Sequence, residues 1–137
     1  MDNKIIGQAT DGLNQGAQRE RFSRTESLAK EHQLTLAVYQ ITVPFPREQL
    51  YGLTSQLRRS ASSIPANLAE DADAMAMPRF PRFCSIALGS ASELEYHLLL
   101  ARDLMLIQPR DYEELAGQAT ELKRMLTALF QKLNADR

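Results

Sequence analysis

Small and apolar residues recur at alternating spacings of three and four along three long stretches of this chain, and no other feature constrains the fold as strongly. The three series are Leu50, Thr54, Leu57, Ala61, Ile64 and Leu68; then Phe80, Cys84, Ala87, Ala91, Leu94, Leu98, Ala101 and Met105; then Tyr112, Leu115, Ala119, Leu122, Leu126, Leu129 and Leu133. Such spacing forms a heptad seam on one side of a helix and favours near-antiparallel packing at about 20°. The sequence therefore predicts an all-α protein.

Prolines indicate where the helices begin and end. Pro44 and Pro46 end a first helix, and Pro78, Pro81 and Pro109 suit helix starts, where an N–H group has no intrahelical partner anyway. The predicted helices span about 25–43, 47–76, 79–106 and 109–134. Because the links between them are short, we expect an antiparallel up-and-down four-helix bundle occupying residues 25–137.

Two segments depart from the regular pattern. Residues 1–24 are polar and glycine-containing without a period, so we expect a mobile tail, or a segment that docks on a neighbouring subunit. Pro65 lies inside the second predicted helix and removes the bond to the Ala61 carbonyl, which predicts a kink. Hydroxyls of Ser60, Ser62 or Ser63 could satisfy the freed carbonyls.

Composition limits the kinds of function. Sixteen basic and seventeen acidic residues give a net charge of -1, so nucleic-acid binding would need a local basic patch. One cysteine, Cys84, precludes an intramolecular disulfide and fits a reducing compartment. No apolar run approaches the roughly 20 residues of a membrane span, and no signal-peptide core is present at the N-terminus. We expect a cytoplasmic protein without membrane contact.

Arginines are the candidate contacts to nucleic-acid phosphates. The candidates are Arg47, Arg58, Arg59, Arg79 and Arg82. The alternative is ion pairing within or between subunits. If the second and third helices fold back near Met77, Arg58 and Arg59 lie level with Glu93, Glu95 and Tyr96, and we expect Arg59 to contact Glu93 directly.

The polar residues near the seams do not form a catalytic or metal pattern. Glu70, Asp71 and Asp73 indicate a solvated acidic helix end, and Glu93 with His97 lacks the spacing of a di-iron bundle. Cys84 lies on a seam, far along the helix from His97, and is expected to be a buried apolar group. We therefore expect no enzyme activity, no metal and no cofactor.

Several short motifs resemble one known family. They are Phe45-Pro46, Gln56-x-x-Arg59-Ser60-Ala61, the run 63–70 (Ser-Ile-Pro-Ala-Asn-Leu-Ala-Glu), Phe80-x-x-Phe83, and Ala87-x-Gly89-Ser90-x-x-Glu93-Leu94. The chain resembles the four-helix-bundle family named after the intervening sequence of 23S ribosomal RNA genes. The resemblance implies a ring of five subunits. Some relatives are accessory proteins of diversity-generating retroelements that bind nucleic acid and a reverse transcriptase.

The family motif also marks four polar residues, Asn67, Glu70, Ser90 and Glu93, which we expect to form structural hydrogen bonds beside the seams; the alternative for Asn67 and Glu70 is to bind a ligand. The chain departs from the family where a glycine and then a basic residue usually follow the position of Glu70. Here those positions are Asp71 and Ala74, and Asp73 adds another negative charge. This local reversal of charge weakens the nucleic-acid hypothesis and leaves the bundle and ring expectations unchanged.

More apolar residues are present than one bundle core needs. Leu36, Tyr39 and Val43 lie beyond the first helix's main stripe, and Ile86 and Leu100 lie off the third seam, whereas Leu57, Ile64, Leu94 and Leu98 are expected in the core. Excess apolar surface is typical of an interface. We expect a non-enzymatic homopentamer that binds nucleic acid; the alternative is a scaffold for a protein partner without nucleic-acid binding.

Overall fold

The computed structural model describes residue 15, residues 26–73 and residues 80–135, and its regular elements in these ranges are all helical. Residues 26–42 form the first helix, followed by a 3-10 turn η1 (Arg47–Gln49), a π-helical turn η2 (Leu50–Thr54), and the helices α2 (Ser55–Asp73), α3 (Phe80–Asp103) and α4 (Pro109–Ala135). The predicted all-α fold is confirmed. Apart from Gln15, the predicted tail 1–24 lies outside the described residues.

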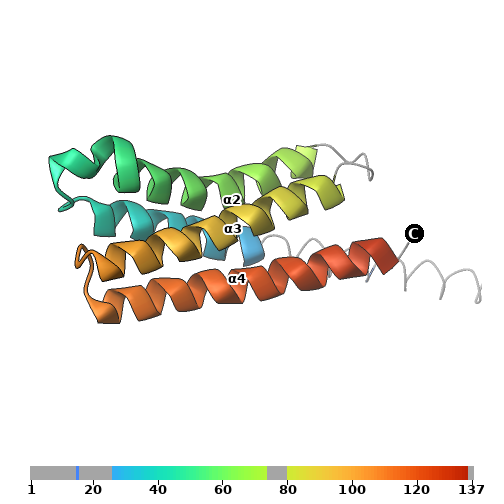
Figure 1. Ribbon diagram of the computed structural model, residues 1–137. Coiled ribbons are helices and arrows are strands. Elements are labelled where there is room, and N and C mark those ends of the chain that lie inside the picture. The colour runs from blue at the N-terminus through green and yellow to red at the C-terminus, as the bar shows by residue number, and fades with distance from the viewer. Residues whose placement is uncertain (1–14, 16–25, 74–79, 136–137) are drawn as a thin grey trace, which may run out of the picture.

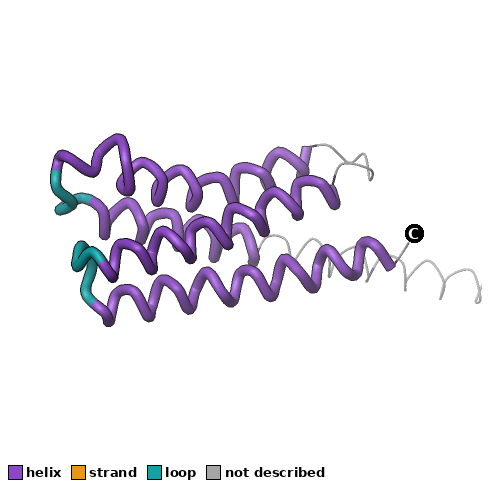
Figure 2. The backbone as a smooth tube through the Cα atoms, in the orientation of Figure 1, coloured by secondary structure: helices purple, strands orange, loops and turns teal. Residues whose placement is uncertain are grey.

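The four helices pack as a bundle in which α2 and α4 occupy diagonal corners (Figure 1). The first helix contacts α2 through Thr35 and Ala61, and contacts α4 through an ion pair between Lys30 and Glu121. Helix α3 packs against both α2 and α4. The described connections, residues 43–46 and 104–108, lie at the same end of the bundle, as Figure 2 shows. Successive helices are therefore antiparallel, as predicted.

The core lies along the predicted seams. Leu57, Ile64, Leu94 and Leu98 are each at most 1% exposed, which confirms their predicted positions. The same apolar cluster includes Leu34, Val38, Ala61, Ala87, Ala91, Ala101, Leu115, Ala119, Leu122 and Leu126. Because each fully buried leucine or isoleucine contributes about 1.5–3 kcal/mol, this cluster is the main stabilising feature of the bundle.

The start of the second predicted helix differs from the prediction. Residues 47–54 form two short irregular turns, and Gly52 departs from helical backbone angles with φ −109° and ψ −113°. A π turn holds more residues than an α turn and so rotates the side chains that precede it. As a result Leu53 is buried and Leu50 is 43% exposed, so the placement of Leu50 on the seam was wrong.

Helix α2 continues through Pro65, and the carbonyl that this proline leaves without a helical donor is satisfied from another helix. The Thr35 hydroxyl on the first helix lies 3.2 Å from the Ala61 carbonyl oxygen and 2.9 Å from that of Glu31, so its hydrogen is shared between them. The prediction that a nearby serine fills this role was wrong. Ser60 and Ser62 bond to other carbonyls of α2. The kink itself stays a prediction.

The end of α3 is earlier than predicted. The helix stops at Asp103, and Met105 adopts a left-handed conformation with φ 59°. The Leu106 N–H donates to the Ala101 carbonyl and the Met105 N–H to the Arg102 carbonyl, each at 2.9 Å, which is the Schellman pattern of helix termination. Met105 is consequently 88% exposed, so its predicted place on the seam was wrong.

Candidate functional site

Arg59 and Glu93 connect the exposed faces of α2 and α3. One guanidinium nitrogen of Arg59 donates to a Glu93 carboxylate oxygen, and the same nitrogen donates to Gln56 Oε1 at 2.8 Å. The side chains of Arg59 and Glu93 are 53% and 35% exposed. The predicted contact is therefore confirmed, and it leaves about half of the arginine side chain accessible to a further ligand.

Arg58 binds the first helix instead of α3. Its Nε donates to the Thr42 hydroxyl oxygen at 2.9 Å, and its guanidinium lies 5.0 Å from the centre of the Tyr39 ring. A cation over an aromatic face is attracted by the electron density of the ring. The expected carboxylate partner of Arg58 on α3 was therefore wrong, because the position of Arg58 on α2 directs its side chain to the first helix.

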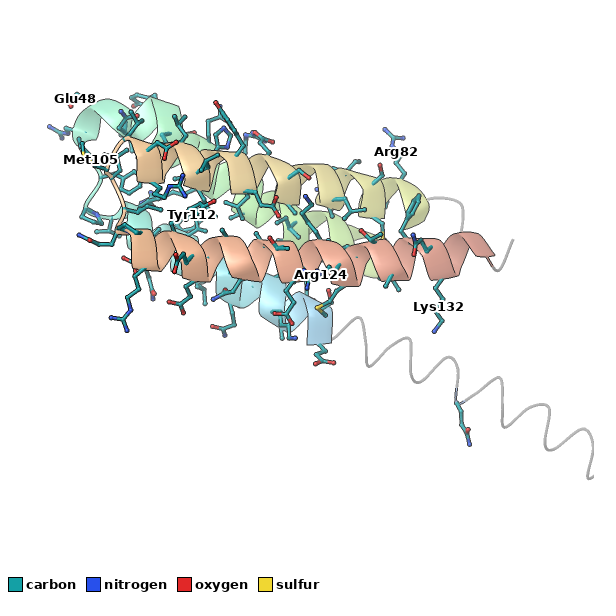
Figure 3. The ribbon with its side chains drawn as sticks, turned by 60° about the horizontal axis from the view of Figure 1, so that its bottom comes forward. Glu48, Arg82, Met105, Tyr112, Arg124 and Lys132 are labelled. Atoms are coloured by element: carbon teal, nitrogen blue, oxygen red, sulfur yellow. The ribbon has the colours of Figure 1, made fainter. Side chains whose placement is uncertain are left out.

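The remaining candidate arginines do not converge within one subunit. Arg47 and Arg82 are both exposed. Arg47 lies beside Glu48 at the end with the two described connections, whereas Figure 3 places Arg82 at the opposite end of the bundle. Arg79 lies outside the described residues. A single subunit therefore has no continuous patch made from the described candidate arginines.

The described polar motif residues bond beside the seam between α2 and α3, Asn67 within α2 and Ser90 across to α2. The Asn67 side-chain amide donates to the Ser63 carbonyl oxygen at 2.7 Å, and the hydroxyls of Ser63 and Ser90 lie 2.9 Å apart. Ser90 is 8% exposed and Ser63 is half-buried, so this hydroxyl pair is partly buried. The side chain of Glu70, the fourth residue of the motif with Glu93, lies outside the described part of the structure.

The described residues do not gather into a metal or nucleophile site. Across 26–69 and 82–132, where side chains are described, no three His, Cys, Asp or Glu residues lie close enough to hold a metal ion. Cys84 is buried, as expected. His97 Nδ1 is buried without a hydrogen-bond partner among the described residues, and burial lowers the pKa of His97 below its ordinary 6.5. The side chains of Asp71 and Asp73 lie outside the described residues.

Two helices expose rows of apolar residues. The first-helix stripe consists of Leu28, Leu36, Tyr39 and Val43, which are 38%, 43%, 44% and 74% exposed. The α3 stripe consists of Ile86 and Tyr96, 41% and 60% exposed, with Gly89 between them; a Cβ atom added at Gly89 would meet no neighbouring atom of the described residues within 4 Å. Large apolar side chains aligned on a surface are typical of protein interfaces.

Both stripes border α2. Tyr39 of the first-helix stripe lies under Arg58 of α2, and Glu93, which lies between the residues of the α3 stripe, pairs with Arg59 of α2. Because one stripe lies on each neighbour of α2, the two stripes occupy adjacent sides of the bundle. They are thus inclined to each other and do not face in opposite directions.

The comparisons with known proteins agree with this architecture. The family model described as 23S rRNA-intervening sequence protein matches residues 24–128. The chain belongs to this family. A similar structure is that of a protein from Bacteroides thetaiotaomicron, described as a protein with unknown function from the S23 ribosomal protein family and solved at 1.70 Å resolution. Its TM-score is 0.71 at 26% identity, covering 80% of this chain and 98% of that one. No curated protein matches the chain.

The family segment includes two residues that the sequence analysis did not select, Thr35 and Glu31. Glu31 is 1% exposed, and the Ser27 hydroxyl donates to its Oε1 at 2.6 Å, whereas its Oε2 has no partner among the described residues. Burial raises the pKa of Glu31 from 4.5 to about 7, and the Ser27 bond partly opposes this. The spacing Ser27, Glu31, Leu34, Val38 gives a core position to Glu31, and this is the signal that could have found it.

No described helix is both long enough and apolar enough to cross a membrane.

Proposed function

We propose that this family member is a non-enzymatic assembly module that forms a homopentameric ring through its two apolar stripes. The observation that supports the ring is the position of the first-helix stripe and the α3 stripe on adjacent sides of α2. A contact between two different surfaces repeats from subunit to subunit, and it closes into a ring when the surfaces are suitably inclined. The number five follows from the family resemblance.

The same geometry predicts which helix faces the ring axis. When two interfaces meet at an edge of the subunit, that edge points toward the axis of the ring. In this bundle the edge is α2, whose exposed residues include Ser55, Ala66 and Ala69, small side chains that tolerate close neighbours. Helix α4, diagonal to α2, would lie on the outside.

Nucleic-acid binding is a second candidate function, and the exposure of Arg59 favours it. Arg59 is 53% exposed on α2, so a ring would place one copy from each subunit around the axis. Repeated arginines around an axis concentrate positive potential that a net charge of -1 conceals. Binding that depends on phosphate contacts falls steeply with salt. We expect a steep salt dependence with RNA or DNA, and a reduced slope in Arg59→Gln.

The interface can be tested with two variants that each disable one stripe. Leu36→Glu places a charge on the first-helix stripe and Ile86→Glu places one on the α3 stripe, and both positions are exposed in the subunit. We expect each variant alone to be a folded monomer by light scattering and circular dichroism. Mixed together, they should form a dimer and nothing larger, because only one intact surface of each kind remains.

Gln131→Glu on α4, also exposed and part of neither stripe, is the matched control and should retain the wild-type mass. If Leu36→Glu alone formed a dimer, the α3 stripes would be pairing with each other. That result would exclude the head-to-tail contact.

A further inference from the structure

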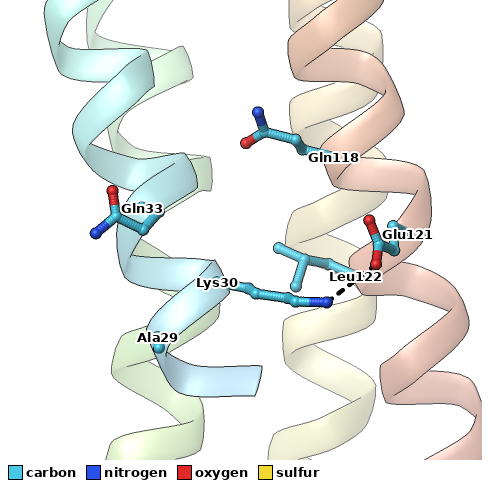
Figure 4. A pocket seen from close by; sticks show the side chains of 6 residues that line it. All are labelled: Ala29, Lys30, Gln33, Gln118, Glu121 and Leu122. Carbon is cyan, nitrogen blue, oxygen red and sulfur yellow. Dashed lines mark hydrogen bonds and ion pairs between the residues drawn. The ribbon is translucent and has the colours of Figure 1, made fainter. Parts of the chain in front are cut away.

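A groove runs between the first helix and α4, on the side of the first helix away from α2. It consists of two depressions, of about 370 and 340 Å³, that share Gln118. Figure 4 shows the first of them, with Lys30 reaching across to Glu121 at 3.1 Å. The side chains of this pair are 44% and 58% exposed. Exposed ion pairs of this kind contribute about 0–1 kcal/mol, so this contact closes the groove only weakly.

The groove has an apolar floor and a polar rim. Small and aliphatic residues contribute the floor, and amides and carboxylates contribute the rim. The floor is Ala37, Ile41, Leu115 and Leu122, which are buried or half-buried; the rim is Gln33, Gln40, Gln118, Asp111, Glu114 and the pair of Lys30 with Glu121, with the exposed Ala29 beside it. An apolar floor between polar edges is the arrangement that accepts one face of an amphipathic helix.

The length of the groove fits a short helix. Its α4 side runs from Asp111 to Leu122, which at 1.5 Å per residue is about 17 Å, or roughly three helical turns. Small side chains at Ala29 and Ala37 allow the backbone of an occupant to approach closely. An occupant with apolar residues at helical spacing could bury three or four of them on this floor.

The charge of the groove selects the occupant. Asp111 and Glu114 line the depression near the start of α4, where no lysine or arginine is among the described lining residues. Neither carboxylate forms an ion pair or side-chain hydrogen bond within the described part of the chain. We propose that this groove binds an amphipathic helix of a partner protein whose lysines or arginines pair with Asp111 and Glu114 while its apolar face covers Ala37 and Leu115.

The groove does not depend on the proposed ring. Its first-helix residues, such as Lys30, Gln33 and Ala37, lie on a different side of that helix from Leu36, Tyr39 and Val43. In the proposed ring, α4 and the groove beside it would lie on the outside. Loss of partner binding and loss of assembly can therefore be measured separately.

The probe is a fluorescent 15-residue peptide with leucines and alanines on one helical face and lysines beside it, and the measurement is anisotropy with the full chain. Glu114→Lys should raise Kd at least about tenfold, since a pair of opposite charges becomes a repulsive one. Glu113→Lys is the matched control, because Glu113 is exposed in the same turn of α4 but does not line the groove. It should change Kd less than about twofold.

A steric variant tests the floor independently of charge. Ala37→Phe fills the groove between the two helices and should weaken peptide binding by a similar factor while light scattering shows an unchanged mass. The same peptide with glutamates in place of lysines should bind the wild type weakly and bind the double variant Asp111→Lys, Glu114→Lys more tightly.

Three results would overturn the proposal. Equal weakening by Glu113→Lys and Glu114→Lys would mean diffuse attraction to an acidic surface. A lower mass for Ala37→Phe would mean that another copy of this chain occupies the groove. A tenfold gain in peptide affinity on deletion of residues 1–24 would mean that the chain's own N-terminal segment competes for the site.

Discussion

The first helix borders α2 on one side and α4 on the other, and the two borders are built differently. Toward α2, Thr35 donates to the Ala61 carbonyl and Thr42 accepts from Arg58, whose guanidinium covers Tyr39. Toward α4, the described part of the groove is crossed by one half-exposed ion pair between Lys30 and Glu121. One helix can therefore have a side that is hydrogen-bonded to its neighbour, which suits permanent assembly, and a side that leaves a groove, which suits an exchangeable partner.

The largest predicted difference is in the free energy of unfolding lost on substitution, between the core beside α2 and the groove beside α4. Ile64→Ala should destabilise the protein by about 2–5 kcal/mol, because Ile64 is 1% exposed and its removal leaves a cavity. Gln118→Ala, in the groove, should change the free energy of unfolding by less than about 0.5 kcal/mol. Urea denaturation at one fixed protein concentration measures both, since assembly makes stability depend on concentration. Similar costs for the two variants would remove the contrast between the borders.

A second prediction concerns Glu31, which lies in the core between the two borders. Its pKa is raised from 4.5 to about 7, so folding opposes its ionisation. The contribution of the protonated Glu31 carboxyl to folding stability is complete below pH 4.5, falls as pH rises from 4.5 through 7, and then remains low. The loss amounts to about 3 kcal/mol at 1.36 kcal/mol per pKa unit.

Glu31→Gln should therefore be more stable than the wild type at pH 8 and should lose most of this pH dependence. Glu26→Gln, exposed on the same helix, is the control and should follow the wild-type curve. Denaturation midpoints between pH 5 and 8 measure both variants. A wild-type protein with constant stability over that range would show that the Glu31 carboxyl has a partner or access to water.

A third, smaller effect compares the two border contacts directly. Thr35→Val should cost about 1 kcal/mol, since it removes the donor to a carbonyl that Pro65 leaves without one. Lys30→Ala should cost less than about 0.5 kcal/mol. In a Pro65→Ala background the backbone N–H of residue 65 can serve Ala61, so the cost of Thr35→Val should shrink. A double-mutant cycle measures this coupling, and additive costs would show that Thr35 does not replace the missing bond.

The sequence was sufficient for the bundle and its core because apolar spacing alone determines which helix face is buried. Leu57, Ile64, Leu94 and Leu98 follow directly from it. The errors lie where local backbone geometry changes the register. The π turn at Gly52 moves Leu50 outward, and the left-handed residue at Met105 ends α3 within an apolar run that reads as helix.

The candidate site was predictable only in part. The Arg59–Glu93 contact follows from the levels of two antiparallel helices. The partner of Arg58 does not, because it depends on which neighbouring helix the side chain reaches, and Thr42 is 16 residues away from Arg58 along the chain. Thr35 was missed because nothing in the first helix indicates that its hydroxyl serves a carbonyl of α2. Glu31 was missed because a seam assigns apolar character to core positions, although its spacing with Leu34 and Val38 gives it such a position.

The mass of the assembly in solution tests the central claim most directly. Sedimentation equilibrium of the full chain at micromolar concentration should give five times the 15.4 kDa mass of one chain. The Leu36→Glu variant in the same cell should sediment at the mass of one chain. A wild-type protein that remains a monomer under these conditions would contradict the ring, and with it the proposal that Arg59 residues gather around a shared axis.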